Sequence, residues 1–298
     1  MVEVTFTFLA ICFLAAILAG FLGGLFGIGG GIIIVPFLSV YMGIPIHQAI
    51  AVSLVSVIAT SNAGGSSYVE QKITNIKLAM YLEVATTAGA LVGSIVALLL
   101  RSWSLFMIFG ILLIYVAFTS FKSRGSDERR MTRNEFATAK QDGISKYLGL
   151  SGSYFDVSQK KQVDYRVNGA SKGALISGLA GVTSGLLGIG GGLIKVAAMN
   201  MFMNVPLKAA VGTSKFMIGV TAAVGSLLFF VTGVIDVYVL APIALGTTLG
   251  ATVGTLIMNR IRSNVLKLGF GLLIVYLAYT MFVQGLALGF GIRLPILG

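Results

Sequence analysis

Long apolar runs, separated by short polar turns, occupy the chain on both sides of one polar stretch. Runs of about 20 residues are long enough to cross the hydrocarbon core of a bilayer as helices. The predicted helices cover 4–26, 47–66, 78–100, 103–121, 173–187, 208–230, 238–259 and 265–290. Two further apolar segments, 31–43 and 192–204, are shorter, and whether each spans or re-enters stays open. The pattern predicts an all-α polytopic membrane protein with roughly eight to ten transmembrane or re-entrant helices.

Composition excludes a soluble globular domain. The 298 residues are 56% hydrophobic and only 10% charged, and the mean hydropathy is +0.95. The net charge of +11 is high enough to suggest nucleic acid as a partner. However, 11 of the 21 lysines and arginines lie in the polar stretch 122–172. This concentration is typical of a cytoplasmic loop, so the predicted surroundings are the lipid bilayer of the cell membrane, without nucleic acid.

The chain contains one block of sequence twice. Residues 14–121 align with residues 175–282 at a constant offset of 161, and 35 of the 108 aligned pairs are identical. The best-preserved piece is Gly-Ile-Gly-Gly-Gly, at 27–31 and again at 188–192. The sequence therefore predicts a first membrane repeat at 1–121, a cytoplasmic polar linker at 122–172 and a second membrane repeat at 173–298.

The charges of the turns predict opposite orientations for the two repeats. With the linker inside, the turn carrying Glu70, Lys72 and Lys77 is also cytoplasmic, whereas the equivalent turn of the second repeat carries Asp236 and no basic residue. Lysine and arginine favour the cytoplasmic side, so this asymmetry favours an inverted duplication over a parallel one. Both termini are then expected outside.

Within the linker, the stretches 154–157 and 163–167 alternate apolar and polar residues around a short polar turn. This pattern predicts a short β-hairpin. A solvated cytoplasmic cap is the favoured interpretation of the linker, and a regulatory or partner-binding role is the alternative.

The paired glycine runs carry the clearest chemical signal. Three consecutive glycines break a helix, and broken backbone at membrane depth is tolerated only where protein buries it or a wet cavity adjoins it. The helix that resumes after each break presents unpaired N–H groups, which favour an anion. Close helix packing is the alternative, and it is preferred for the spaced pairs Gly20/Gly24, Gly89/Gly93 and Gly250/Gly254.

Charged residues at membrane depth are few, and the informative ones are Glu83, Lys195 and Lys215. Each costs about 2.5–3.5 kcal/mol at a helix centre, so each is expected to face a partner or a water-filled path. A structural ion pair, such as Glu83 with Lys215, and a direct substrate role are both open. Lys195 can alternatively extend to the membrane surface.

Hydroxyl residues repeat in register beside the breaks. Ser53 matches Ser214, and Thr60 matches Thr221. They are candidate ligands, although such hydroxyls also bond to their own or neighbouring helices. The predicted substrate-binding set is Gly29, Gly30, Gly31, Ser53, Thr60, Gly190, Gly191, Gly192, Lys195, Ser214, Lys215 and Thr221, with Glu83 as the proton-coupling residue.

The two Gly-Ile-Gly-Gly-Gly runs, each followed by an apolar helix, a proline turn at Pro45 or Pro206 and a serine-containing helix, resemble the sulfite exporter TauE/SafE family. The likeness covers about 14–121 and 173–282. It implies a membrane carrier for sulfite, sulfonates or other small sulfur-containing anions.

We therefore predict a secondary carrier or exporter with alternating access around a midplane site between the repeats. An anion channel and a membrane sensor or assembly protein acting through the linker are the alternatives. The sequence contains no metal-ligand cluster, no nucleophile with a base and no nucleotide motif, so we predict no enzyme, metal or cofactor. The identity of the anion, the direction of transport, the coupling ion and whether the chain forms a homo-oligomer stay open.

Overall fold

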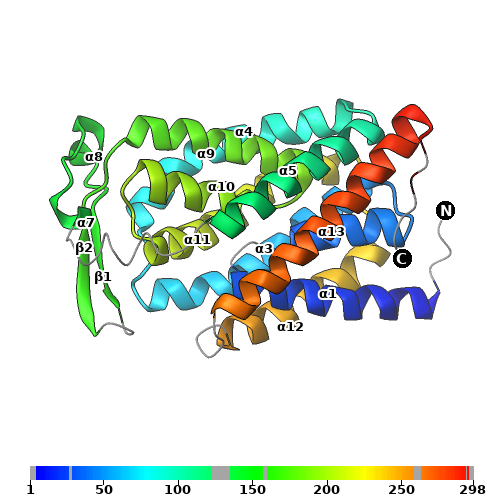
Figure 1. The fold of residues 1–298 in the computed structure, drawn as a ribbon, viewed down its shortest axis with the longest axis horizontal. Helices are drawn as coiled ribbons and strands as arrows, with labels where there is room; N and C mark the ends of the chain where they lie inside the picture. The colour runs from blue at the N-terminus through cyan, green and yellow to red at the C-terminus, as the bar shows by residue number, and fades with distance from the viewer. Residues whose placement is uncertain are drawn as a thin grey trace.

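Helices make up nearly all of the secondary structure in the computed structural model (Figure 1). It describes residues 5–26, 29–122, 135–156, 160–257, 263–292 and 294. The first repeat contains α1 (Phe6–Phe26), α2 (Gly31–Pro36), the π-helical turn η1 (Phe37–Tyr41), α3 (Ile46–Glu70), α4 (Ile76–Leu99) and α5 (Ser102–Lys122). The second repeat contains α9 (Ala170–Leu187), α10 (Gly192–Ala197), η2 (Ala198–Phe202), α11 (Leu207–Val231), α12 (Val237–Ile257) and α13 (Ser263–Phe290). The apolar runs predicted at 47–66, 78–100 and 208–230 correspond to α3, α4 and α11.

Six helices of the described part are long and apolar enough to cross a membrane. They cover Phe6–Leu25, Ile46–Glu70, Ile76–Leu99, Leu207–Val231, Val237–Leu256 and Gly271–Phe290. Shorter apolar helices cover Gly31–Tyr41, Ser102–Phe118 and Gly192–Phe202. At 1.5 Å per residue, the 11 residues of Gly31–Tyr41 reach only about half of the way across a ~30 Å core.

The linker forms a small layer at one end of the helices. It contains α7 (Glu135–Thr138), α8 (Gly143–Tyr147) and the strands β1 (Gly152–Asp156) and β2 (Lys161–Tyr165). The strands pair antiparallel with Tyr154 opposite Val163, where the alternating sequence predicts a hairpin. The start of α1 and the end of α13 lie at the opposite end of the molecule (Figure 1).

The hairpin is anchored to the end of a membrane helix. Asn75, which caps α4 by accepting from the Leu78 amide at 3.0 Å, donates through Nδ2 to the Tyr165 hydroxyl at 3.0 Å and to the Leu150 carbonyl at 2.7 Å. Burial raises the pKa of Tyr165 to about 12. The linker therefore packs on the helices through buried polar contacts as well as apolar ones.

Helix packing repeats itself with the offset of 161. α1 packs against α12, and α9 packs against α4 in the equivalent way. A Cβ atom on Gly20 would lie 2.2 Å from the Thr247 carbonyl oxygen. A Cβ atom on the equivalent residue, Gly181, would lie 2.1 Å from the carbonyl oxygen of Thr86. Both contacts require glycine, so the packing interpretation of the spaced glycines is confirmed here.

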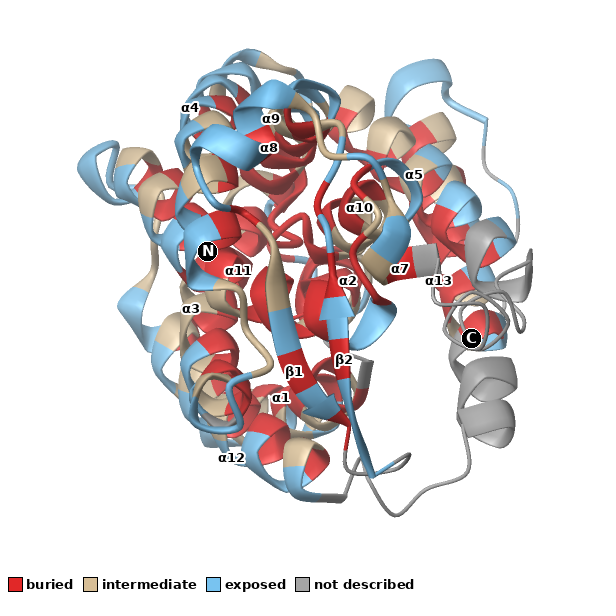
Figure 2. Cartoon of the chain, turned by 90° about the vertical axis from the view of Figure 1, so that its left-hand side faces the viewer, coloured by how far each residue is buried: buried red, intermediate tan, exposed pale blue. Residues whose placement is uncertain are grey.

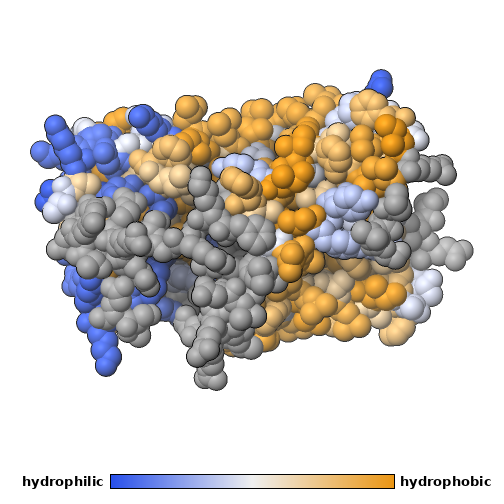
Figure 3. Space-filling model, viewed as in Figure 1, coloured by the Kyte–Doolittle hydropathy of each residue, from blue (hydrophilic) through white to orange (hydrophobic). Residues whose placement is uncertain are grey.

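Buried residues gather between the helices, whereas the outer faces are exposed and apolar. Figure 2 shows the buried positions concentrated around α2, α3, α10 and α11. Large apolar side chains such as Val84 and Leu175 are more than two-thirds exposed. Hydrophilic residues collect at the end with the strands, and an apolar surface covers the helical body (Figure 3). This distribution is the one expected of a protein whose helices face lipid.

Candidate functional site

Both glycine breaks use backbone conformations that glycine alone adopts readily. Gly30 precedes α2 with φ 76°, and Gly191 precedes α10 with φ 65°. Gly29 and Gly190 are also left-handed, with φ 84° and 72°. A residue with a side chain is disfavoured in this region by about 1–2 kcal/mol. The repeated run therefore encodes a specific chain reversal between α1 and α2, and between α9 and α10.

The two breaks lie against each other in the interior. A Cβ atom on Gly31 would lie 2.3 Å from the Gly188 carbonyl oxygen. Two equivalent side chains, Val57 and Ile218, touch both breaks: a Cβ atom on Gly190 would lie 2.9 Å from Val57 Cγ1 and 2.8 Å from Ile218 Cγ2. On Gly29 the corresponding distances are 3.1 Å and 3.6 Å. The breaks of the two repeats thus form one central region.

Three of the four predicted hydroxyl residues bond directly to this region. Ser53 Oγ donates to the Gly188 carbonyl at 2.8 Å, across the boundary between the repeats. Thr60 Oγ1 donates to the Gly29 carbonyl at 3.0 Å, and Ser214 Oγ donates to the Gly192 carbonyl at 3.2 Å. All three hydroxyl residues are buried. Their first role is therefore structural: each hydroxyl donates to a backbone carbonyl group in or next to a glycine break.

The fourth hydroxyl joins two charged groups. Lys195 Nζ donates to Thr221 Oγ1 at 2.6 Å. Thr221 Oγ1 in turn donates to Glu83 Oε1 at 2.7 Å. Lys195 is completely buried. The interpretation in which Lys195 extends to the membrane surface is therefore wrong: its ammonium group turns inward, where a hydroxyl and a nearby carboxylate compensate for lost water.

Lys215 lies beside α1 and not beside Glu83, with which an ion pair was considered. Its Nζ donates to the Gly24 carbonyl at 3.1 Å and lies 4.8 Å from the centre of the Tyr68 ring. An ion pair of Lys215 with Glu83 is therefore wrong, because Glu83 bonds to the Thr221–Lys195 side instead. Gly24 lies in the last turn of α1, so the ammonium group compensates the negative end of that helix.

Sequence reasoning missed Val57 and Ile218, although a signal was present. The two residues are equivalent at the offset of 161 and are 0% and 1% exposed. Because they are apolar, they gave no chemical reason to single them out. The structure shows both side chains packed against Gly29 of one break and Gly190 of the other.

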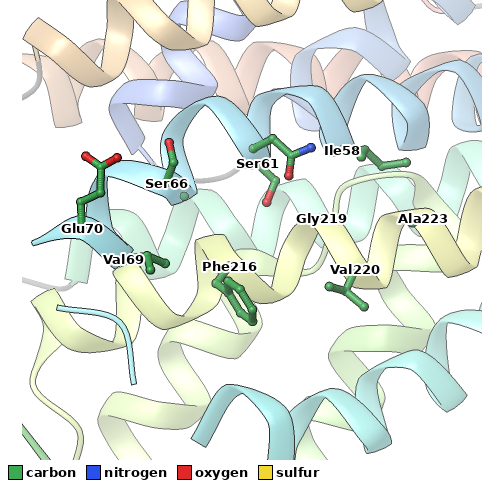
Figure 4. A pocket seen from close by; sticks show the side chains of 11 residues that line it. Ile58, Ser61, Ser66, Val69, Glu70, Phe216, Gly219, Val220 and Ala223 are labelled. Atoms are coloured by element: carbon green, nitrogen blue, oxygen red, sulfur yellow. The ribbon is translucent and has the colours of Figure 1, made fainter. Parts of the chain in front are cut away.

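A groove of about 730 Å³ lies between α3 and α11, beside the central region. Figure 4 shows Ser61, Gly219 and Ile58 from these helices along it. The groove contains none of the predicted substrate-binding residues, but Ile58 and Gly219 directly follow Val57 and Ile218 in sequence. It also contains Asn62, an exposed polar residue within a candidate membrane helix.

No group of three or more histidine, cysteine, aspartate or glutamate residues in the described ranges is placed to hold a metal ion. The polar groups that the structure brings together at the central region are the glycine backbone, buried hydroxyl groups and the buried ammonium group of Lys195. This combination suits the binding of an anion through hydrogen bonds and charge.

Comparison with known proteins places the chain among membrane transporters. The profile of the family described as "Sulfite exporter TauE/SafE" matches residues 12–281. The chain is 26% identical over 279 residues to the probable membrane transporter protein YunE of Bacillus subtilis, covering 91% of this chain and 96% of the relative. It is 25% identical over 258 residues to the probable membrane transporter protein YdhB of the same species, covering 86% and 91%.

A shorter match, 48% identical over 71 residues and 24% of each chain, is to a probable membrane transporter protein of Haemophilus influenzae. No solved structure matches the chain. Because the profile covers most of the chain, including both glycine breaks, the chain belongs to the sulfite exporter TauE/SafE family of transmembrane transporters.

Proposed function

We propose that this chain is a secondary carrier of small sulfur-containing anions, such as sulfite or organosulfonates. The observation that carries the proposal is the meeting of both glycine breaks at Val57 and Ile218, with a buried lysine nearby. In our proposal the substrate binds between the breaks near the membrane midplane. The predicted hydroxyl residues and Lys195 supply its hydrogen bonds and its counter-charge.

The mechanism that we propose is alternating access between inverted repeats. In Figure 1, α1 begins at the end of the molecule away from the strands, whereas its equivalent, α9, begins at the strand end. The equivalent helices α5 and α13 also run in opposite directions. Carriers with inverted repeats bind substrate at the repeat interface and move one part against the other around it. In our proposal this interface includes the Ser53–Gly188 bond, which joins the two repeats.

The helix ends favour an anion over a cation at this place. The first amide groups of α2 and α10 follow Gly30 and Gly191, and helix N-termini carry partial positive charge. Lys195 adds a full charge in a region from which water is largely excluded. The proposed site is therefore complementary to one small anion, and sulfite and sulfonates present the oxygen atoms that such amides and hydroxyls bind.

Moving an anion through an inside-negative membrane requires either compensation of its charge or an outward direction. Export runs down the membrane potential, which contributes about 2.3 kcal/mol per charge per 100 mV. Import requires a coupled cation, and Glu83 is the proposed proton carrier. With the linker cytoplasmic and both termini outside, the strand end of the molecule faces the cytoplasm.

Transport assays with purified protein in liposomes test this function. The panel contains sulfite, sulfate, thiosulfate, sulfoacetate and simple carboxylates, and thermal stabilisation by each anion is measured in parallel. Saturable uptake with counterflow supports a carrier, whereas non-saturable conductance without counterflow indicates a channel. Absence of both binding and uptake for the whole panel overturns the proposal and favours a sensor or assembly role for the linker.

A further inference from the structure

A buried chain of three polar groups connects three helices of the bundle. Lys195 on α10 donates to Thr221 on α11 at 2.6 Å, and Thr221 lies 2.7 Å from Glu83 on α4. Thr221 has one hydroxyl proton, which either Glu83 Oε1 or the Met217 carbonyl at 2.9 Å can accept. The hydroxyl therefore mediates between the ammonium group and the carboxylate.

The carboxyl group of Glu83 is incompletely satisfied. Its Oε2 atom is buried and has no hydrogen-bond partner among the described residues. An ionised carboxylate has several acceptor sites to fill, whereas the protonated form needs fewer and carries no charge. The geometry is therefore compatible with both protonation states: Lys195 supports the ionised form, and the vacant oxygen supports the protonated one.

The charged groups are additions to the repeated scaffold. At the offset of 161, Lys195 corresponds to Ile34 and Glu83 corresponds to Ala244. Thr60, the equivalent of Thr221, bonds to the Gly29 carbonyl of its own break. The break of the second repeat therefore has a lysine of its own beside it, where the first repeat has an isoleucine. Packing of the helices alone does not require this charge.

The two lysines of α11 have partners away from Glu83. α4 packs against α9 and α11. On α11, Lys208 pairs with Asp156 at 2.7 Å, and Lys215 bonds to the Gly24 carbonyl. Lys172 on α9 is exposed. Tyr81, which precedes Glu83 on α4 by two residues, is the nearest titratable group in the sequence.

We propose that Glu83 acts as an internal anion, which holds Lys195 while the carrier is empty and is protonated when the transported anion takes its place. This inference rests on the proposed carrier function and specifies its coupling. One proton binds to the Glu83 carboxylate, and one monoanion binds to the Lys195 ammonium group. The site then gains no net charge, so transport of a monoanion with one proton is electrically neutral.

Protonation and anion binding favour each other in this scheme. Low pH neutralises Glu83 and frees Lys195, so anion affinity rises as pH falls. Above the pH at which Glu83 ionises in the empty protein, the apparent dissociation constant rises tenfold per pH unit. A proton gradient directed inward then drives import, because the anion binds on the acidic side and is released on the alkaline side.

Methanesulfonate is the probe for the test, because it carries one negative charge across the whole pH range. Binding to purified full-length protein is measured by calorimetry in buffers of different ionisation enthalpy, which gives the number of protons taken up. The variants are Glu83→Gln, Lys195→Met and the double variant. Gln retains an oxygen that can accept from Thr221, and thermal unfolding verifies that each variant folds. Asp164→Asn and Lys172→Met, at exposed positions, are the matched charge controls.

Above the pH at which Glu83 ionises in the empty protein, we expect one proton per anion in the wild type and in both controls. We expect none at any pH in Glu83→Gln, whose anion affinity does not depend on pH. Lys195→Met and the double variant lose anion binding at least tenfold at every pH. In liposomes, uptake by Glu83→Gln responds to membrane potential and no longer to a pH gradient.

Anion binding without proton uptake in the wild type at every pH, or unchanged pH dependence in Glu83→Gln, overturns the proposed coupling and leaves the carrier function standing. Wild-type affinity in Lys195→Met overturns it as well. If neither methanesulfonate nor any sulfur anion of the panel binds or is transported, the carrier function itself is contradicted, and the proposed coupling with it.

Discussion

Ser53 of the first repeat donates a hydrogen bond of 2.8 Å to the carbonyl oxygen of Gly188 in the second. Ser56, one turn further along the same helix, donates instead to Val52 of its own helix at 2.8 Å. Both serines are buried. One hydroxyl therefore joins the two repeats at the glycine break, and its neighbour serves its own helix alone.

This difference makes the two serines a matched pair for mutation. Ser53→Ala leaves a buried carbonyl of the break without its partner, which costs about 1–3 kcal/mol. We expect a lower unfolding temperature and at least a fivefold loss of transport. Ser56→Ala removes only a bond within one helix and retains near wild-type flux. Equal losses of flux in both variants would contradict a special role for Ser53.

The left-handed glycines of the breaks give a second comparison. Gly30 and Gly43 both have positive φ angles, 76° and 66°. A Cβ atom on Gly30 would lie 3.1 Å from the Ala19 carbonyl oxygen, whereas a Cβ atom on Gly43 would have no heavy atom within 4 Å. At either position, a residue with a side chain is disfavoured in this backbone conformation by about 1–2 kcal/mol. We expect Gly30→Leu to abolish anion uptake in protein that still inserts, and Gly43→Ala to retain it.

Gly191 provides the same test in the second repeat. A Cβ atom there would lie 2.5 Å from the Ala180 carbonyl oxygen, while the surroundings of Gly233, also left-handed, are open. Uptake and membrane insertion are measured for Gly191→Leu against Gly233→Ala. Wild-type uptake by correctly inserted Gly30→Leu and Gly191→Leu would show that the breaks do not form the site.

Orientation in the membrane is predicted from the charges of the turns. Cys12 is buried and is the one cysteine of the chain, so single cysteines are introduced into a Cys12→Ala background. A cysteine at residue 127, which lies outside the described residues, is expected to resist a membrane-impermeant maleimide applied to intact cells. A cysteine at residue 236 is expected to react. The reverse pattern would contradict a cytoplasmic linker.

The repeat, the glycine breaks and the hydroxyl residues beside them could be predicted because each follows from local sequence. Identities at a constant offset reveal the duplication, and three glycines in a row favour a broken helix, which the structure has at both runs. The partners of the buried charges could not be predicted, because they depend on which helices become neighbours. Glu83 meets Lys195 through Thr221 only because α4 packs on α11. Val57 and Ile218 were missed for a related reason: they are ordinary apolar residues, and the sequence does not show that they pack against both glycine breaks.

The groove between α3 and α11 is expected to contain water. Asn62 is exposed there, and an amide facing hydrocarbon without a partner is unfavourable. Asn62→Cys should react with an impermeant maleimide from the cytoplasmic side of inverted vesicles. Val84→Cys, on the lipid-facing side of α4 and 75% exposed, should not. Lack of reaction at residue 62 together with reaction at residue 84 would contradict a wet groove.

Counterflow of labelled sulfite in liposomes tests the central claim most directly. Liposomes containing the purified protein are loaded with unlabelled sulfite and diluted into a trace of labelled sulfite. A carrier whose site lies between the two glycine breaks predicts transient, saturable accumulation of label that is absent in Gly191→Leu and present in Gly233→Ala. Uptake no greater than that of protein-free liposomes, or flux that neither saturates nor shows counterflow, would contradict the account.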